Sequence, residues 1–298
     1  MSDFYEELRE ILPEAAIKRG EPMAKHTTFR IGGPARYYLV PGTQEALIRL
    51  VSLCRREAVA WYVVGHGSNL LAGDEGYDGV ILSTEGLTGF QAGGEEIRAE
   101  AGLLLSRMAR EAADRSLTGF EFAAGIPGTL GGAVVMNAGA YGSEMKDCLV
   151  WARVLDAEGS VRNLRSEELE LGYRKSCIPA RGYVVLEAGI RLQRGEEPKI
   201  RQRMEELARK RREKQPLEYP SAGSTFKRPE GYFAGKLIDD AGLRGYRVGG
   251  AQVSEKHCGF VINRDRATAA DVLALCGEVK GRVLEQFGVE LELEIKLL

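Results

Sequence analysis

The segment from residue 120 to residue 142, FEFAAGIPGTLGGAVVMNAGAYG, places the strongest constraint on how this chain can fold. It contains six glycines, nearly as many alanines and one charged residue, Glu121. Side chains this small cannot fill a hydrophobic core by themselves, so their density predicts that the backbone closely approaches something flat or bulky. A packed pair of helices rich in glycine and alanine is the alternative interpretation.

The composition is typical of a soluble chain of two or three domains, with 298 residues, 44% hydrophobic and 28% charged. The 41 basic and 43 acidic residues give a net charge of −2, which predicts no general attraction to nucleic acid or membrane. The acidic N-terminus is unlike a signal peptide, and no apolar run is long enough to span a bilayer. Five scattered cysteines without a CxxC pair predict a cytoplasmic protein without disulfides or a metal site.

A second segment, SAGSTFKRP at 221–229, suggests a different chemistry. Its STFK has the SxxK spacing of penicillin-binding proteins and serine β-lactamases, in which the serine is acylated. The partner motifs SDN and KTG are absent from the sequence. A serine nucleophile needs a base and a proton relay, so this isolated motif is weak evidence for an acyl-serine enzyme.

Hydrophobic periodicity predicts an alternation of helices and strands along the chain. Helices are expected over 4–12, from Thr43 to Cys54, and over 103–115, 197–214, 234–240 and 268–287. Strands are expected over 36–40, 61–64, 79–83, 96–100, 149–156, 183–192, 249–254 and 259–263. The ending VELELEIKLL alternates strictly between apolar and charged residues, which predicts a final strand with Glu290, Glu292 and Glu294 on its polar face.

Common nucleotide-binding motifs fail when their spacing is tested. The sequence after Gly65 and Gly67 lacks the third glycine of the Rossmann fingerprint. The segment GYFAGKL at 231–237 is one residue short of a P-loop and lacks the serine or threonine that would hold magnesium. What remains is GHGSN after a predicted strand, where successive backbone N–H groups can form a nest for an anion such as a pyrophosphate. A dinucleotide with a large tricyclic ring would suit both this loop and the 120–142 segment.

Several motifs together resemble the UDP-N-acetylenolpyruvoylglucosamine reductase family. They are HTTFRIGGPA (26–35), GHGSN (65–69), GIPGTLGGAVVMNAGAYG (125–142), GYRKS (172–176), AGSTFK (222–227) and GLRGYRVGGAQVSEKHCGFVIN (242–263). The resemblance covers nearly the whole chain, with motifs in both halves.

The resemblance implies an α+β fold, in which a two-lobed FAD-binding domain of the vanillyl-alcohol-oxidase/PCMH type precedes an α+β substrate-binding domain. We place the two lobes at 1–85 and 86–196 and the substrate domain at 197–298, with the terminal strand able to return to the first lobe. The implied enzyme is an oxidoreductase with non-covalent FAD and with NADPH as reductant. It reduces a UDP-sugar enolpyruvyl ether to UDP-N-acetylmuramate for peptidoglycan synthesis. We further expect a cytoplasmic monomer that binds neither nucleic acid nor membrane.

The chemistry of that reaction requires three kinds of group. Hydride delivered to the outer alkene carbon leaves an enolate-like dianion, which needs a cation, a hydrogen-bond donor or acid at the carboxylate, and a proton donor at carbon. The resemblance assigns these roles to Arg174, Glu294 and Ser224. An arginine suits a two-point grip on a carboxylate, and Ser224 would give its hydroxyl proton to the carbanion. Only the resemblance distinguishes Glu294 from its acidic neighbours.

The resemblance also implies binding residues. The expected FAD contacts are Gly65, Gly67, Ser68, Asn69, Gly125, Pro127, Gly128, Gly131, Gly132, Asn137, Ala138 and Gly139. The expected substrate contacts are Tyr173, Arg174, Lys214 and Lys227. Arg228 departs from the asparagine expected in relatives, and the segment after GYRKS has no room for the tyrosine-bearing loop that some of them insert.

Two other functions remain open on the sequence alone. The GHGSN loop by itself is also compatible with a flavin oxidase of a small hydroxy acid or sugar, which would consume oxygen with an alcohol. STFK by itself predicts an acyl-serine hydrolase, which would form a stable adduct of Ser224 with penicillin.

Overall fold

The computed structural model describes residues 4–298, and the chain divides into two compact units built from discontinuous segments. The first unit comprises residues 4–19, 37–66 and 79–211, and the second comprises 20–36, 67–78 and 212–298. The predicted boundaries at 85/86 and 196/197 cut the chain into continuous ranges and stay a prediction.

Three strands carry the chain from one unit to the other. They are β1 (Ile17–Pro22), β2 (Pro34–Leu39) and β5 (Tyr77–Ser83). They form a four-stranded sheet of order β1-β2-β5-β3 with β3 (Trp61–Val64), and β3 pairs parallel to β5. Helix α2 (Gln44–Arg56) lies between β2 and β3 in sequence, with Thr43 as its N-cap. Apolar residues of α2 and of α1 (Phe4–Ile11) share a buried core with these strands, as the period of 3.6 residues predicts.

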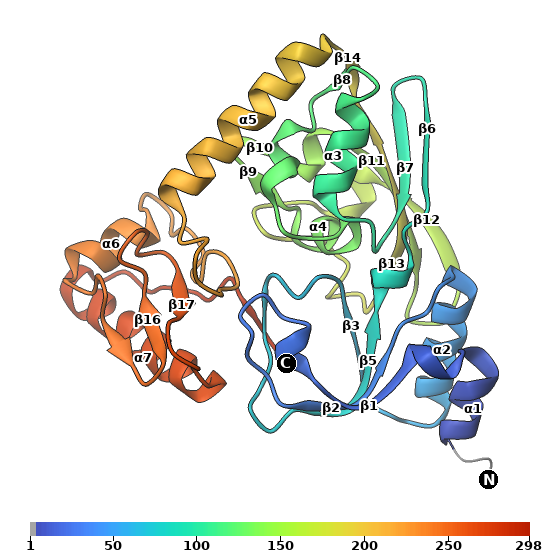
Figure 1. Cartoon of the computed structure of the whole chain (residues 1–298), viewed down its shortest axis with the longest axis horizontal. Helices are drawn as coiled ribbons and strands as arrows, with labels where there is room; N and C mark the ends of the chain where they lie inside the picture. The colour runs from blue at the N-terminus through green and yellow to red at the C-terminus, as the bar shows by residue number, and fades with distance from the viewer. Residues whose placement is uncertain (1–3) are drawn as a thin grey trace. The chain divides into compact units, whose positions relative to one another are not determined.

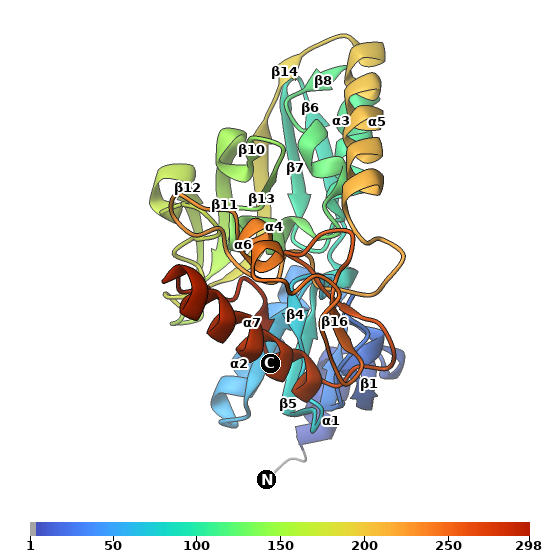
Figure 2. The same cartoon turned by 90° about the vertical axis from the view of Figure 1, so that its left-hand side faces the viewer.

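The rest of the first unit is built on a five-stranded antiparallel sheet of order β12-β11-β13-β7-β6. Its strands are β6 (Phe90–Gly93), β7 (Glu96–Glu100), β11 (Leu149–Leu155), β12 (Val161–Arg165) and β13 (Val184–Arg191). Strands β7 and β13 are neighbours in this sheet and pair antiparallel (Figure 2). Helices α3 (Leu105–Ala113) and α4 (Leu130–Met136) pack on one face and enclose a second core (Figure 1).

Short elements complete the first unit. They are β8 (Leu117–Thr118), β9 (Gly139–Ala140), β10 (Ser143–Glu144), β14 (Gln193–Arg194) and the 3-10 helices η1 (Glu14–Ala16), η3 (Thr84–Gly86), η4 (Glu121–Gly125), η5 (Met145–Asp147) and η6 (Ser166–Leu169). The predicted charged helix is confirmed as α5 (Glu197–Lys214).

The second unit encloses its own core between a small sheet and one long helix. Strands β15 (Arg247–Val248), β16 (Ala251–Val253) and β17 (Val261–Asn263) form an antiparallel sheet, against which α7 (Ala269–Phe287) packs (Figure 1). The unit also contains η2 (Met23–Lys25), β4 (Leu70–Leu71), α6 (Ala234–Asp240) and β18 (Lys296–Leu297). Thr268 and Asp271 form a capping box at the start of α7, where the predicted helix begins.

The predicted long terminal strand is wrong. After α7 the chain makes only an isolated bridge at Leu293 and the two-residue β18, which pairs parallel to β4. The segment changes partner between these two pairings, and a bend at Ile295 lies between them. The alternation therefore breaks: Glu294 is 9% exposed and Leu297 is 53% exposed.

Candidate active site

The glycine-rich segment becomes η4, α4 and the β9–β10 hairpin in the first unit. The segment contains a single α-helix, so the alternative of a packed helix pair is wrong. Part of its glycine content is still explained by packing within the protein: a Cβ on Gly131 would lie 2.9 Å from the Cβ of Ala101. Gly132, in the first turn of α4, is exposed, and a Cβ there would meet nothing nearer than the Thr129 hydroxyl at 3.7 Å. Gly139 is also tightly packed, because a Cβ there would lie 2.7 Å from the Cβ of Glu144. The segment thus contains both tightly packed glycines and an open one, Gly132.

Asn137 joins this segment to the GYRKS turn. Its backbone is left-handed (φ 41°) and ends α4, and its side chain is completely buried. The amide Nδ2 donates to the carbonyl of Gly172 at 3.0 Å, and Oδ1 accepts from the N–H of Lys146 at 2.9 Å. Its expected contact with FAD stays a prediction, while in the structure the amide fixes the turn that carries Arg174.

Arg174 stands at the tip of a tight hairpin turn. Gly172 and Lys175 exchange backbone hydrogen bonds of 3.0 and 3.1 Å, which leaves Tyr173 and Arg174 at the two central positions. Arg174 has φ 52°, a left-handed conformation that is strained for a residue other than glycine. Its Nη2 donates to the carbonyl of Gly139 at 3.2 Å, and its guanidinium lies 5.2 Å from the ring centre of Tyr173. Two predicted substrate residues therefore lie beside predicted cofactor residues within the first unit.

The GHGSN loop begins at the end of β3. In the first unit, a Cβ on Gly65 would lie 2.4 Å from the hydroxyl of Thr129, the N-cap of α4. Only glycine therefore lets this strand end sit against the start of the glycine-rich helix. This close approach and the open surface at Gly132 fit the expected FAD contacts.

The remainder of the loop belongs to the second unit. Gly67 is left-handed (φ 62°), and a Cβ there would lie 2.0 Å from the carbonyl oxygen of His26. Asn69 holds the loop to the end of the chain, because its Nδ2 donates to the carbonyl of Glu294 at 3.2 Å and its carbonyl accepts from Lys296 at 2.9 Å. Predicted cofactor and catalytic residues thus meet here within one unit.

Replacing Gly67 with alanine should lower both stability and flavin retention. A side chain is strained on a left-handed backbone, and the new Cβ would also overlap a backbone oxygen that cannot rotate away. Together these effects predict a loss of about 2 kcal/mol or more in the free energy of unfolding. Gly94→Ala is the matched control, since Gly94 also has φ 62° but nothing within 4 Å of its Cβ position. Urea denaturation and the flavin absorbance of the purified variants test this. Equal losses in both variants would contradict the role of the close approach.

The SAGSTFK segment pairs antiparallel with the end of the chain. Thr225 accepts from the N–H of Glu294 at 2.8 Å, and Lys227 donates to the carbonyl of Glu292 at 2.8 Å. The buried Thr225 hydroxyl accepts from the N–H of Val261 at 2.9 Å. Ser224 is half-buried, and its hydroxyl has no hydrogen-bond partner among residues 4–298. The segment thus fixes Ser224 beside the strand that carries Glu294 and leaves its hydroxyl available.

Lys227 does not serve as the base that an acylated serine would require. Its Nζ is ion-paired with Glu292 Oε2 at 2.6 Å, and this hydrogen bond lowers the pKa of Glu292. The paired ammonium is a donor rather than a proton acceptor, which counts against the acyl-serine interpretation. Its predicted contact with substrate would require exchange of this carboxylate partner.

Burial separates Glu294 from the acidic residues around it. Glu290 and Glu292 are exposed, whereas Glu294 is among the few buried charged residues. The alternating sequence predicts the same environment for all three, so it gives no signal for this difference. Burial of one carboxyl next to the Ser224 strand is a feature that structural packing alone would disfavour.

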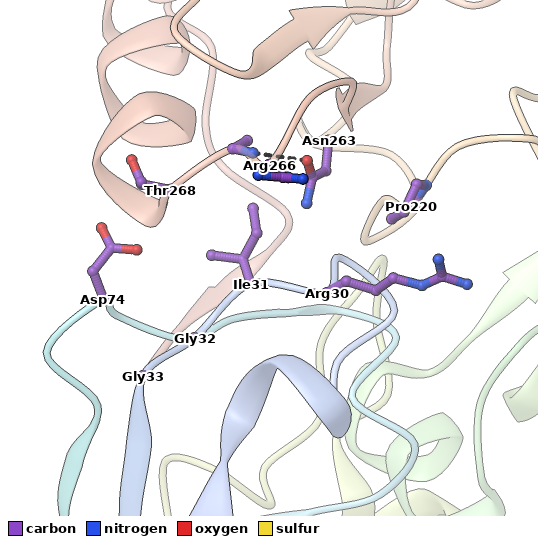
Figure 3. A pocket seen from close by; sticks show the side chains of 10 residues that line it. Arg30, Ile31, Gly32, Gly33, Asp74, Pro220, Asn263, Arg266 and Thr268 are labelled. Carbon is purple, nitrogen blue, oxygen red and sulfur yellow. Dashed lines mark hydrogen bonds between the residues drawn. The ribbon is translucent and has the colours of Figure 1, made fainter.

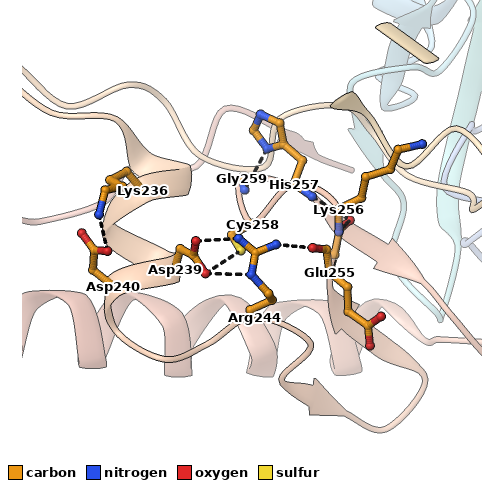
Figure 4. A network of polar contacts seen from close by, with 10 residues as sticks. Lys236, Asp239, Asp240, Arg244, Glu255, Lys256, His257, Cys258 and Gly259 are labelled. Carbon is orange, nitrogen blue, oxygen red and sulfur yellow. Dashed lines mark hydrogen bonds and ion pairs between the residues drawn. The ribbon is translucent and has the colours of Figure 1, made fainter. Parts of the chain in front are cut away.

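The sequence pattern predicts no role for His257. Its Nδ1 accepts from the N–H of Gly259 at 3.1 Å, which leaves the proton of the neutral ring on Nε2. The carbonyl of Gly259 accepts from the N–H of Thr225, the residue after Ser224. The loop that carries His257 is thus hydrogen-bonded to the segment that carries Ser224. The ring stands apart from the ion pair of Arg244 with Asp239 and from Cys258 (Figure 4). The sequence around His257 does not show whether its ring is available as an Nε2–H donor or is packed in the core.

Burial lowers the pKa of His257, and the charges of Arg244 and Lys214 lower it further. In the unfolded chain the pKa of this histidine is near 6.5. When the pH falls below that value, the unfolded chain therefore binds a proton that the folded protein does not bind. We expect stability to fall as the pH falls through this range, and to fall less in His257→Gln. Urea denaturation at pH 7.5 and 5.5 measures the difference, and the same pH dependence in both proteins would contradict it.

An open cavity of about 550 Å³ lies elsewhere in the second unit (Figure 3). It is lined by residues of four chain segments, including Arg30, Asp74, Pro220 and Arg266. Asp74 accepts from the N–H groups of Ala269 and Ala270 and so caps α7. None of the predicted catalytic or binding residues lines this cavity.

The five cysteines are buried and unpaired. No group of three or more histidine, cysteine or acidic side chains within residues 4–298 is placed to hold a metal ion. No helix in the same range has the length and apolar character needed to cross a membrane.

Comparison with known proteins identifies the family of this chain. The FAD binding domain family matches residues 35–165, and the family of UDP-N-acetylenolpyruvoylglucosamine reductase C-terminal domains matches residues 215–298. A UDP-N-acetylenolpyruvoylglucosamine reductase of Lachnoclostridium phytofermentans is 54% identical over 298 residues, covering 98% of this chain and 96% of the relative. This chain belongs to the UDP-N-acetylenolpyruvoylglucosamine reductase family. The family's enzyme from Caldanaerobacter subterraneus is 51% identical, with 98% of this chain and 97% of the relative covered.

Solved structures support the predicted fold class. The UDP-N-acetylenolpyruvylglucosamine reductase of Thermus caldophilus aligns with a TM-score of 0.82 and 37% identity, covering 94% of this chain and 98% of that one. The glucose dehydrogenase Phl p 4.0202 aligns with a TM-score of 0.51 over 66% of this chain and 45% of that one, at 14% identity, a likeness of fold alone. The predicted α+β fold with an FAD-binding domain is confirmed. As a member of this reductase family, the chain is an FAD-dependent oxidoreductase of peptidoglycan synthesis, with NADPH as reductant.

Proposed function

We propose that this chain reduces UDP-N-acetylglucosamine enolpyruvate to UDP-N-acetylmuramate. In the balanced reaction NADPH, one proton and the enolpyruvyl ether give NADP⁺ and the lactyl ether. Bound FAD would carry the hydride from NADPH to the outer alkene carbon. The protein must then stabilise charge at the carboxylate and deliver a proton to the adjacent carbon.

The proposed roles of the chain's own residues follow from these needs. Arg174 binds the substrate carboxylate with its guanidinium, which can donate two parallel hydrogen bonds. Glu294 is the hydrogen-bond donor or acid at the same carboxylate. Ser224 donates its hydroxyl proton to carbon. Tyr173, Lys214 and Lys227 help to hold the substrate.

The observation that best supports this proposal is the pairing of the two chain segments in the second unit. Glu294 donates its N–H to Thr225, the residue after Ser224. The buried carboxyl group of Glu294 and the half-buried hydroxyl group of Ser224 are thereby held on neighbouring segments of the chain. Acid chemistry at one substrate needs two such groups close together.

The proposed cofactor contacts lie in both units. Gly65, Gly125, Pro127, Gly128, Gly131, Gly132, Asn137, Ala138 and Gly139 belong to the first, and Gly67, Ser68 and Asn69 to the second. The close approach of Gly65 to Thr129 and the open surface at Gly132 support a bound dinucleotide there.

Purified protein tests the function directly. We expect a yellow protein with flavin absorbance, and NADPH oxidation that depends on added UDP-N-acetylglucosamine enolpyruvate. A colourless protein without such oxidation would refute the proposal. Oxygen consumption with an alcohol substrate, such as a small hydroxy acid or a sugar, would instead indicate an oxidase. A penicillin adduct at Ser224 would indicate an acyl-serine enzyme.

We also propose a cytoplasmic monomer without nucleic-acid or membrane partners. The net charge of −2 and the five unpaired, buried cysteines support this setting. Sedimentation of the purified protein tests the oligomeric state.

A further inference from the structure

The second unit carries an exposed aromatic ring on the loop that follows the STFK segment. Phe233 is 62% exposed, and the adjacent Tyr232 is 47% exposed. Single exposed apolar residues are common on protein surfaces, so exposure alone does not indicate a site. What distinguishes Phe233 is the charged group held against it.

Arg228 stacks on Phe233. The guanidinium carbon lies 3.9 Å from the ring centre, and Nε donates to the carbonyl of Tyr232 at 3.3 Å. A turn fixes the loop, with the N–H of Tyr232 bonded to Pro229 and Gly231 left-handed at φ 75°. The carbonyl of Phe233 accepts from the N–H groups of Lys236 and Leu237, so the backbone of Phe233 is anchored at the start of α6. We name Arg228, Tyr232 and Phe233 the aromatic platform.

We infer that the aromatic platform binds the uracil ring of the UDP-sugar, an inference that rests on the proposed function. The substrate has three parts that are recognised differently: the carboxylate, the diphosphate and the nucleobase. The carboxylate and the diphosphate are bound by positively charged groups. A nucleobase has a flat face that stacks on aromatic rings and guanidinium planes. Phe287, another exposed aromatic residue of the second unit, ends α7, and no cation within residues 4–298 stacks on its ring.

Continuity of the chain and of charge favours this occupant. Arg228 directly follows Lys227, and the loop is anchored at Phe226 by its bridge to Leu293, next to Glu294. One short loop therefore runs from the proposed proton donor, Ser224, through Lys227 to the platform, which begins at Arg228. A UDP-sugar has its parts in the corresponding order, from the modified sugar through the diphosphate and ribose to the base, so the platform's charge and aromatic surface both match it.

Binding of UMP and of ribose 5-phosphate to the holoenzyme tests this inference, because the two ligands differ only by the base. We expect Phe233→Ala to weaken UMP binding about tenfold and to leave ribose 5-phosphate binding unchanged. Phe233→Trp should retain UMP affinity, whereas Phe233→Leu, which is apolar without a π-face, should not. The KM for the UDP-sugar should rise with little change in kcat. Phe287→Ala is the matched control and should change neither quantity.

Each alternative result has a distinct meaning. UMP binding unaffected by Phe233→Ala, or no UMP binding by the wild-type holoenzyme, would overturn the inference. Equal weakening of both ligands would also overturn it, since the loss would then come from loop disruption. Absence of NADPH oxidation by the wild-type protein, with base-dependent UMP binding retained, would refute the proposed reaction and leave the platform standing.

Discussion

Ser224→Ala should slow the transfer of reducing equivalents to the enolpyruvyl substrate by roughly 10²- to 10⁴-fold, the usual contribution of a positioned general acid. Reduction of the flavin by NADPH should proceed at the wild-type rate, because no carbanion forms in that half-reaction. Rapid-mixing absorbance of the flavin measures the two half-reactions separately. The hydroxyl of Ser224 has no protein partner within residues 4–298, so its removal should cost little stability.

Ser221→Ala provides the matched control on the same loop. Ser221 contributes its backbone carbonyl to a bond with Thr28 at 2.6 Å, and alanine keeps that carbonyl. We expect this variant to have wild-type rates in both half-reactions. If Ser224→Ala slows both half-reactions equally in a folded protein, the serine positions the cofactor or the fold, and its role as proton donor is wrong.

Local sequence patterns predicted the regular elements well. Helices α2 and α7 begin close to where caps and periodicity place them, because each has an apolar face and a threonine N-cap. Helix α5 buries only Ile200 and Leu207, and its high charge predicted it instead. The same logic failed at the terminus. Alternation specifies a strand only when one partner runs along its whole length, and here the partner changes between Leu293 and Lys296.

Properties set by tertiary packing were not predictable from the sequence. The burial of Glu294, the tautomer of His257 and the stacking of Arg228 on Phe233 each depend on residues distant in the chain or on a specific turn. The alternation of the two compact units along the chain also leaves no local signal, because most of the crossings occur inside ordinary strands or inside helix α5. The resemblance to a family selected Glu294 where the pattern did not, but it assigned Asn137 no part in holding the Arg174 turn.

Arg174→Gly should produce an enzyme that is at least as stable as Arg174→Ala but equally inactive. Arg174 has φ 52°, which costs a non-glycine residue about 1–2 kcal/mol and costs glycine little. The alanine variant keeps that strain and the glycine variant releases it. The free energy of unfolding of the glycine variant should therefore be higher by about 1 kcal/mol, and it should unfold at a higher urea concentration. Both variants lose the guanidinium, and we expect kcat/KM for the UDP-sugar to fall at least about a hundredfold.

Ala58→Gly separates relief of strain from loss of function. Ala58 is exposed after α2 and has φ 51°, so glycine should stabilise it by a similar amount without removing any functional group. If strain at Arg174 serves to present its side chain, Ala58→Gly gains stability with full turnover, and Arg174→Gly recovers stability only by giving up catalysis. Substantial turnover by Arg174→Gly, or lower stability than Arg174→Ala, would show that the left-handed backbone has another cause.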